Sequence, residues 1–385
     1  MTFPAISPRN QVFLAFYLYA VQLGGIFPRI AELQLKMDVG EGALGLGLLG
    51  FALGTQVTLM LGNRWVERLG PRLVLLLGIP VLGLAAILAA LSPGIPAFFA
   101  SLVFGGIAIG AVEIVVNVEA DRTELLLGRR IMSRAHAFWS FGFFTAGFIG
   151  SVAAQARISP VLHLTGLWVA VSIISWVVLW RYKPAPVRNT GAETVPRFVR
   201  PNLGILTLVA FTLSAMLLEG AGTDWSVIYM RDLFDQSAFI NGMAFSAGAL
   251  AQAVTRYFAD TVVDRFGPYA TARFFILVLG LGTVTVVFSP MPGLSLLGFA
   301  LIGAGTSVLF PLAMSAAAQR TDRPAAVNVA SVAQLSFIVF LLAPPSLGFI
   351  AEHIGIRYSF AVGLPLVLLS WFAAHSLVKP NQTKF

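Results

Sequence analysis

Long apolar segments, separated by short polar turns, follow one another along almost the whole chain. A helix needs about 20 mostly apolar residues to cross a bilayer, and twelve segments meet that requirement. The pattern therefore predicts an all-α membrane protein with twelve transmembrane helices. We expect these helices near residues 10–33, 42–62, 73–91, 97–118, 133–155 and 161–181, and then near 203–230, 238–258, 270–289, 293–317, 326–350 and 357–378.

One connection between the apolar segments is long and polar. It runs from Tyr182 to Asn202, contains four prolines, and has six apolar segments on either side. We therefore predict an N-terminal six-helix bundle over residues 1–181, a linker over residues 182–202 and a C-terminal six-helix bundle over residues 203–385.

Short motifs recur at a fixed spacing, which indicates an internal repeat. Residues 67–71 (Glu-Arg-Leu-Gly-Pro) follow the second apolar segment, and residues 264–268 (Asp-Arg-Phe-Gly-Pro) follow the eighth, an offset of 197 residues (264 − 67). The same offset relates the Ser-Pro pair at 92–93 to that at 289–290, and Gly25 to Gly222. We therefore expect the two bundles to be parallel duplicates, an arrangement known from transporters.

Composition agrees with lipid as the surrounding solvent. The chain is 57% hydrophobic and 11% charged, with a mean hydropathy of +0.85, whereas soluble domains carry roughly 25% charged residues. It has no cysteine, which excludes disulfides and thiolate metal sites. The first apolar segment, from about Gln11 to Leu33, is too long for a cleavable signal peptide, and no small-residue cleavage site follows it.

Basic residues fall mainly on one side of the predicted membrane. With the N-terminus placed in the cytoplasm, five of the 25 Lys and Arg lie on the opposite side of the membrane, and the other 20 (25 − 5) lie on the cytoplasmic side. Membrane proteins concentrate these residues in cytoplasmic loops, so we expect a multi-pass protein with both termini in the cytoplasm. This explains the net charge of +8 without a nucleic-acid partner. The five on the opposite side are Arg29, Lys36, Arg157, Arg231 and Arg357.

The repeated turn resembles the signature loop of the major facilitator superfamily, Gly-x-x-x-Asp-Arg-x-Gly-Arg-Arg. The first copy departs from it, with Glu67 as the acid, Pro71 in place of Arg, and Gly62 one residue too far upstream. Residues 132–139 (Met-Ser-Arg-Ala-His-Ala-Phe-Trp) and 219–226 (Glu-Gly-Ala-Gly-Thr-Asp-Trp-Ser) resemble a bacterial subgroup related to sugar permeases of the fucose permease type.

This resemblance implies a secondary transporter that works by alternating access in the inner membrane of a bacterial cell. We expect coupling to protons and a small polar substrate such as a sugar or polyol, with import favoured over export on the strength of the resemblance. Drug or metabolite efflux by proton antiport is the alternative within transport. A membrane sensor that keeps the transporter fold is an alternative of another class.

In the superfamily, the signature loop is a conformational latch. The resemblance therefore implies that both turns hold one face of the protein closed, with acids at the end of the fourth span as partners. Simple anchoring of the topology by arginine remains the alternative. The implied latch residues are Glu67, Arg68, Gly70, Asp264, Arg265 and Gly267, with Glu119 and Asp121 as partners.

Ionisable residues inside a membrane are expensive and therefore candidates for function. Glu113 and Asn117 are four residues apart and share a helix face. His136 begins the next span, at similar depth, so we hypothesise that Glu113 and His136 form a pair that carries the coupling proton. A fixed structural pair, or pairing of Glu113 with Arg134, is the alternative.

Two acids and two glycines lie close together in the seventh span. Glu219 and Asp224 flank Gly220 and Gly222, and paired glycines weaken a helix, so we expect this span to be broken where it lines a cavity. Both acids are further candidates for proton coupling. Close helix packing at the glycines, or pairing of Asp224 with Arg29 or Arg231, is the alternative. The predicted substrate-binding residues are Tyr19, Gln22, Gln56, Asn117, Trp139, Glu219, Trp225, Gln252 and Gln334.

Other classes of function find no support in the sequence. It has no phosphate-binding Gly-x-x-x-x-Gly-Lys-Ser/Thr loop, and its four histidines lack metal-ligand spacing. We expect no enzyme activity, no cofactor and no metal. The expected partners are a small-molecule substrate, protons and membrane lipid, and we expect a monomer.

Overall fold

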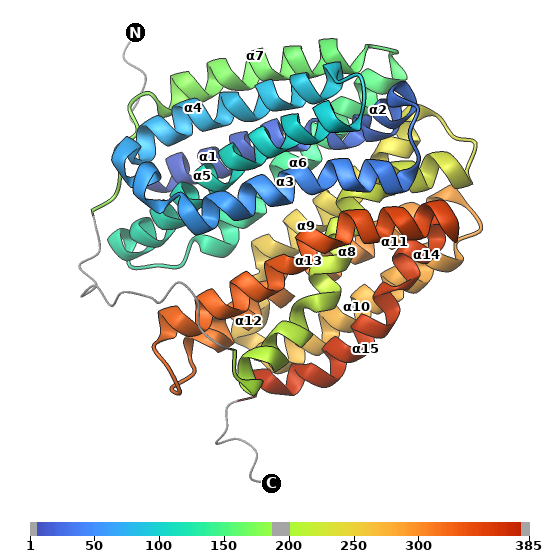
Figure 1. Cartoon of the computed structure of the whole chain (residues 1–385). Coiled ribbons are helices and arrows are strands. Elements are labelled where there is room, and N and C mark those ends of the chain that lie inside the picture. The colour runs from blue at the N-terminus through green and yellow to red at the C-terminus, as the bar shows by residue number, and fades with distance from the viewer. Residues whose placement is uncertain (1–5, 187–200, 379–385) are drawn as a thin grey trace.

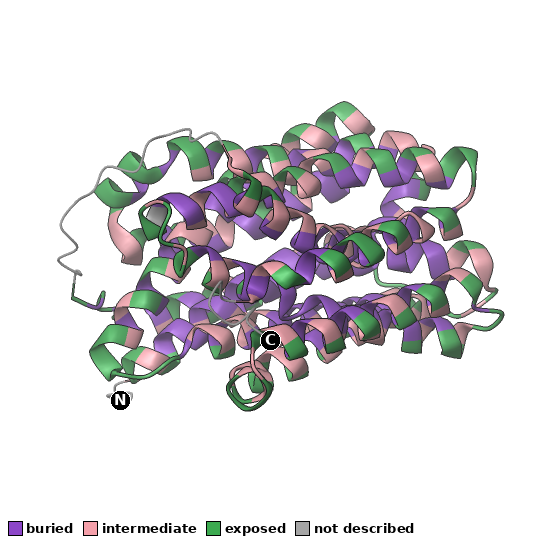
Figure 2. Ribbon diagram, turned by 90° about the horizontal axis from the view of Figure 1, so that it is seen from below, coloured by how far each residue is buried: buried purple, intermediate pink, exposed green. Residues whose placement is uncertain are grey.

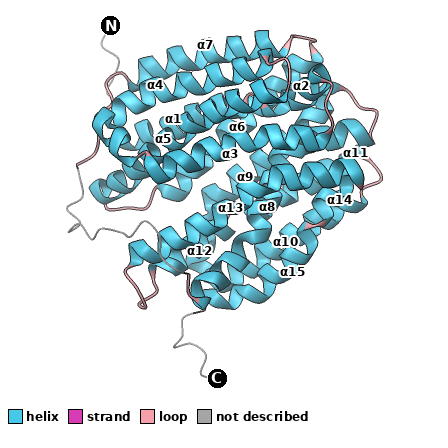
Figure 3. Cartoon of the chain, viewed as in Figure 1, coloured by secondary structure: helices cyan, strands magenta, loops and turns pink. Residues whose placement is uncertain are grey.

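The computed structural model of the chain describes residues 6–186 and 201–378, and within these ranges it contains helices and no strand (Figure 3). Short 3₁₀ helices, η1 (Phe27–Arg29) and η2 (Ala374–Leu377), join or extend the α-helices. The α-helices of the first half are α1 (Pro8–Gly24), α2 (Ile30–Met37), α3 (Glu41–Leu61), α4 (Asn63–Leu91), α5 (Ile95–Leu127), α6 (Met132–Gln155) and α7 (Pro160–Leu179). Those of the second half are α8 (Leu203–Leu233), α9 (Ala238–Phe266), α10 (Pro268–Phe288), α11 (Pro292–Thr306), α12 (Leu309–Ala318), α13 (Ala325–His353), α14 (Ile356–Ala361) and α15 (Gly363–Ala373).

These helices form twelve spans, because three spans are each built from two consecutive helices: α1 with α2, α11 with α12, and α14 with α15. In the described part of the chain, eleven spans are long and apolar enough to cross a membrane. The remaining one, α9, has 29 residues but carries Asn241, Gln252 and Arg256 within its length. The predicted all-α membrane fold of twelve helices is confirmed.

Two groups of helices, α1–α7 and α8–α15, lie side by side (Figure 1). They pack together along α3 against α13 and along α6 against α9. Buried positions face the inside of each group (Figure 2), with Phe16 and Phe211 fully buried. Large apolar side chains such as Leu77, Leu281 and Phe372 point outward. An apolar outer surface is suited to lipid, which has no water to hydrogen-bond with polar groups.

Backbone geometry supports the internal repeat. Gly70 has φ 75° and ψ 158°, and its repeat mate Gly267 has φ 78° and ψ 161°. Glycine is the residue that adopts this region readily. A proline follows each glycine, Pro71 and Pro268. The two turns therefore share both sequence and conformation.

The expected break in the seventh span is wrong. Helix α8 runs through Gly220 and Gly222 without interruption for 31 residues. The break lies instead in the first span, where α1 ends at Gly24 and η1 and α2 follow. Helical hydrogen bonding would require the N–H of residue 28 to reach the carbonyl of Gly24, but residue 28 is a proline and has no N–H.

The halves touch at both ends of the bundle. We call the end that carries residues 180–186 and 201–203 the linker end, and the opposite end the far end. At the far end, the Glu352 carboxylate accepts from the N–H of Gly42 at 2.7 Å, and Arg231 donates to Gln34 at 2.9 Å. At the linker end, the Ser133 hydroxyl donates to Asp260 at 2.7 Å. The polar residues between these ends are therefore enclosed by both halves.

Both described ends of the linker are held by acids. Glu119, which is buried, accepts from the Tyr182 hydroxyl at 2.7 Å and the Ala185 N–H at 3.0 Å. Burial, together with the adjacent Glu119 carboxylate, raises the pKa of the Tyr182 hydroxyl. Asp322 accepts from the side chain of Asn202 and pairs with Arg320 at 3.1 Å. The hydrogen bond from Arg320 lowers the pKa of Asp322 to about 2. Residues 187–200 of the predicted linker lie outside the described ranges.

Candidate functional site

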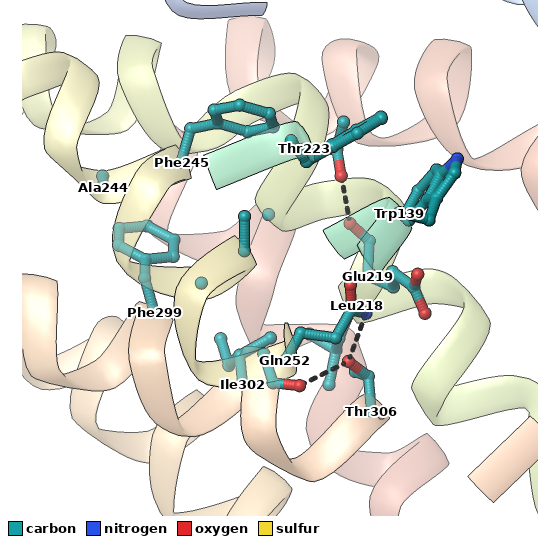
Figure 4. Close-up of a pocket in the computed structure, with 15 residues that line it drawn as sticks. Trp139, Leu218, Glu219, Thr223, Ala244, Phe245, Gln252, Phe299, Ile302 and Thr306 are labelled. Carbon is teal, nitrogen blue, oxygen red and sulfur yellow. Dashed lines mark hydrogen bonds between the residues drawn. The ribbon is translucent and has the colours of Figure 1, made fainter. Parts of the chain in front are cut away.

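A cavity lies near the middle of the molecule between α6 of the first half and α8, α9 and α11 of the second (Figure 4). Its volume is about 40 Å³. Since one water molecule needs roughly 10–15 Å³ of such a cavity, there is room for a few waters and none for a sugar. The lining residues are Trp139, Phe143, Leu218, Glu219, Gly222, Thr223, Ala244, Phe245, Gly248, Ala249, Gln252, Phe299, Ile302, Gly303 and Thr306.

Three predicted substrate residues, Trp139, Glu219 and Gln252, line this cavity. Glu219 and Trp139 approach it from facing helices, α8 and α6 (Figure 4). The Glu219 side chain is 21% exposed. Trp139 stacks on Phe143 with the ring centroids 4.1 Å apart. Gln252 accepts from the Ser140 hydroxyl at 2.9 Å, which is a buried hydrogen bond between the halves.

Arg256 lies deeper than the sequence pattern predicts. It is one of the 20 basic residues expected on the cytoplasmic side, but α9 continues for ten residues beyond it (266 − 256), which places it about 15 Å inside that helix end. Its guanidinium donates to Glu219 at 3.3 Å, to Ser140 at 3.0 Å and to the Ser307 carbonyl at 3.4 Å. It also lies over the ring of Trp139 at 5.8 Å. One cation therefore contacts both halves beside the cavity.

A second polar cluster belongs to the first half. The Asn117 amide donates to the Glu113 carboxylate at 3.2 Å, and the Asn117 carbonyl lies 3.2 Å from Nε2 of His136. The expected direct Glu113–His136 pair is therefore replaced by a chain in which Asn117 stands between them. Tyr19 lies beside Glu113, and Arg256 is close enough to act electrostatically on both Glu113 and His136. Ser140 links the two clusters, because it accepts from Arg256 and donates to the carbonyl of His136.

The remaining predicted substrate residues lie away from the cavity. Gln22 is buried against the backbone of Gly83 and the ring of Trp168, both in the first half. Trp225 is fully buried and packs on Gly348 of α13. Gln56 is half-exposed on α3 and Gln334 is exposed on α13.

Asp224 lies on α8, half-buried and outside the cavity lining. The expected alternatives of pairing with Arg29 or Arg231 are wrong. Arg29 pairs with Glu32 at 2.7 Å, and Arg231 pairs with Asp232 at 2.6 Å.

The two predicted latch turns differ in their contacts. Asp264 pairs with Arg130 of the first half at 3.5 Å, with both side chains exposed. Arg265 instead lies over its neighbour Phe266. Glu67 and Arg68 are exposed, and neither makes an ion pair within the described residues. Glu119 is committed to Tyr182, Ala185 and Arg122 and is therefore not the partner of Arg68. Asp121 follows it on the same helix.

Comparison with known proteins gives a family and a fold. A model of the Major Facilitator Superfamily matches residues 12–338 and again residues 207–384. An uncharacterised transporter of Sinorhizobium fredii is 29% identical over 96% of this chain and 98% of its own. A mutant of the nucleoside transporter NupG superposes with a TM-score of 0.75 at 13% identity, covering 97% of this chain and all of that one. A mutant of the E. coli fucose:proton symporter gives a TM-score of 0.64 at 15% identity, covering 97% and 98%.

Proposed function

The chain belongs to the Major Facilitator Superfamily of secondary transporters, and from this premise we propose that it carries a small polar organic solute together with protons. The observation that supports this most is the pair of polar clusters around Arg256, which join the two halves beside a shared cavity. Alternating access requires that contacts between the halves form and break as the cavity opens to each side. A polar solute that bridges these groups would bias that change.

The proton is assigned to a carboxylate of each polar cluster. Glu219 of the second half pairs with Arg256, and Glu113 of the first half is bonded to Asn117. Protonation of either acid would weaken its attraction to the guanidinium and so shift the balance between conformations. His136, bonded to Asn117, and Asp224 on α8 are secondary candidates.

The direction and placement follow the sequence patterns. We infer import of a sugar or polyol from the resemblance of residues 132–139 and 219–226, and a cytoplasmic linker end from the distribution of Lys and Arg. The Arg130–Asp264 pair supports a latch at that end. The first-copy residues Glu67, Arg68 and Gly70 would engage in another conformation of the cycle.

Efflux of an aromatic cation is a second candidate, because aromatic rings form much of the cavity wall. Trp139, Phe143, Phe245 and Phe299 surround it, and Glu219 offers a negative charge. Import of a polar solute agrees better with Arg256, whose positive charge beside Glu219 opposes a cationic ligand.

The test is a thermal-shift screen of purified protein against sugars, polyols, nucleosides and aromatic cations at pH 5.5 and pH 7.5. A ligand that binds the folded protein raises its unfolding temperature in proportion to the occupancy. Stabilisation by a neutral or anionic polar solute supports the proposal, and stabilisation by aromatic cations alone supports efflux.

Proton coupling is then tested with the radiolabelled hit in proteoliposomes. We expect an inward pH gradient to drive accumulation in the original protein, and Glu113→Gln to abolish that accumulation while exchange without a gradient persists. Full gradient-driven uptake by this variant would remove Glu113 from the proton pathway. Asp38→Asn, at an exposed acid of the first half, is the matched control.

A further inference from the structure

We propose that Arg256 binds the substrate directly, and that the substrate class is a polar solute bearing a carboxylate, such as a sugar acid. This inference rests on the proposed transport function and names the chemistry that its central site would recognise. It goes beyond the sugar or polyol that the sequence patterns suggest, because neither of those requires a fixed positive charge.

The guanidinium of Arg256 has unused binding capacity. Arginine has five N–H donors in a planar fork, and three hydrogen bonds engage Ser140, Ser307 and Glu219. The contact with Glu219 is a single one at 3.3 Å, longer than the 2.7–2.9 Å of a strong charge-assisted bond. The Arg256 side chain is 12% exposed, so a ligand can reach it once the cavity opens.

The position of Glu219 makes it a competitor for the substrate. It lines the cavity that a solute would enter, and it holds the guanidinium through one oxygen. A substrate carboxylate would take the place of Glu219 on Arg256, in the two-point geometry that arginine favours. The displaced Glu219 would then accept the coupling proton, so that it is not left as an unpaired charge.

Charge balances in this exchange. Before binding, the pair consists of Arg256 with its positive charge and Glu219 with its negative charge. After binding, Arg256 pairs with the substrate carboxylate and Glu219 carries the proton as a neutral acid. One anion and one proton enter together, so the net charge of the site does not change. The other titratable groups near the pair belong to the first-half cluster that Ser140 links to Arg256, namely Tyr19 of α1, Glu113 of α5 and His136 of α6.

The first experiment compares acids with neutral solutes of the same carbon skeleton. D-glucuronate is matched with D-glucose, D-gluconate with D-glucitol, and L-lactate with propane-1,2-diol, each titrated at pH 5.5 by thermal shift and by intrinsic tryptophan fluorescence, to which Trp139 beside Arg256 contributes. We expect at least one acid to bind, and to bind at least tenfold more tightly than its neutral counterpart.

Variants then separate a binding role from a structural one. Arg256→Gln should weaken binding of the acid by about 30-fold or more, since it removes one partner of a buried charge pair. Arg256→Lys, which keeps the charge without the fork, should be intermediate. Glu219→Gln should tighten binding of the acid and remove its pH dependence, a gain that loss of structure cannot produce. Arg64→Gln, at an exposed arginine of α4, is the control.

The second experiment measures charge movement in proteoliposomes with the acid that binds. We expect the pH gradient to drive uptake of the acid. A potassium diffusion potential set with valinomycin should not change the uptake rate, because entry of one anion with one proton is electroneutral. Uptake driven by that potential would contradict the inference.

The outcomes distinguish the two proposals. If a neutral solute binds as tightly as its acid and Arg256→Gln has no effect on that binding, the inference is wrong while the proposed function stands. If none of the six compounds and none of the screened solutes binds at either pH, both are wrong.

Discussion

The first and seventh spans occupy equivalent places in the two halves, yet their backbones differ. Span one is interrupted after Gly24, whereas span seven is a continuous helix of 31 residues with two glycines inside it. The repeat mate of Pro28 is Trp225 (28 + 197). Proline removes the backbone donor that the next helical turn needs, whereas glycine only lowers helix propensity. The difference teaches that a missing donor, more than a flexible residue, interrupts a helix in this bundle.

The side chains of the two spans have diverged in the same way. Gln22 in span one is buried against Gly83 and Trp168 inside its own half, while its mate Glu219 (22 + 197) faces the cavity. Gly25 is packed against Leu167, while its mate Gly222 faces open space. Span one is thus a packed element and span seven a cavity wall. Two predictions test this division, and two more compare other parts of the halves, in order from the largest expected effect to the smallest.

The largest effect on stability is expected when Gln22 and its repeat mate Glu219 are each replaced by the other's residue type. In Gln22→Glu the new carboxyl is buried and must either stay protonated or be charged without a partner. Holding a carboxyl with an ordinary pKa near 4.3 protonated at pH 7 costs about 3–4 kcal/mol. We therefore expect a stability loss of about 3 kcal/mol at pH 7 that shrinks towards pH 4.5, measured by thermal unfolding in detergent.

The reverse exchange, Glu219→Gln, is the control for that measurement. Glutamine keeps a carbonyl oxygen that can accept from Arg256, and the ion pair that it replaces is one contact at 3.3 Å, so the stability loss should be clearly smaller than that of Gln22→Glu. Equal losses for the two variants would contradict the division into packed element and cavity wall.

The glycine mates should respond with opposite signs. A Cβ on Gly25 would lie 2.5 Å from a methyl carbon of Leu167, whereas a Cβ on Gly222 would meet nothing within 4 Å. Gly25→Ala should therefore destabilise by about 1–3 kcal/mol through overpacking. Gly222→Ala should stabilise by up to about 1 kcal/mol, because alanine is the better helix former. The unfolding temperature should fall in Gly25→Ala and rise in Gly222→Ala, and a change of the same sign in both would contradict the prediction.

The signature turns should behave alike, in contrast to the spans. Gly70 and Gly267 share positive φ angles, and neither has a neighbour that a Cβ would strike. Alanine at either position should cost about 1–2 kcal/mol from backbone strain alone. Thermal unfolding should give losses that agree within about 0.5 kcal/mol, and a clear inequality would show that the two turns are no longer equivalent.

The smallest effect is expected at the linker end of the second half. Asp322 has its pKa lowered to about 2, so its contribution is present above the unfolded value near 3.9 and is lost as pH falls through 2. Because the group is mostly in solvent, Asp322→Asn should lose less than about 1 kcal/mol. The loss should be constant from pH 8 to about pH 5. Asp38→Asn, at an exposed acid of the first half, should show no such loss.

The apolar pattern predicted the twelve spans and the repeat because both depend on segment length and on turn residues. It failed at Arg256 because it ended the eighth span near residue 258, just before the acids Asp260 and Asp264. Helix α9 continues to Phe266 because those residues are satisfied by the other half, as Asp260 is by Ser133. Contacts between halves are invisible to a pattern that treats polar residues as a sign of water.

The candidate site was predicted in part for a related reason. Spacing gave the depth of Glu113, His136 and Glu219, and depth was sufficient to bring them near the centre. It did not give the rotation of each helix, which decides whether a side chain meets the cavity or its own half. The insertion of Asn117 between Glu113 and His136, and the inward burial of Gln22, both follow from rotation.

The small volume of the cavity has a consequence for how the protein responds to water activity. Space for a few water molecules must expand to hold a solvated solute, so each opening draws water into the protein. Osmolytes that are too large to enter the cavity would then favour the closed form, since they are excluded from the newly exposed surface. The turnover rate should fall as the osmolality outside and inside a vesicle rises together, and its slope would count the waters that each cycle takes up.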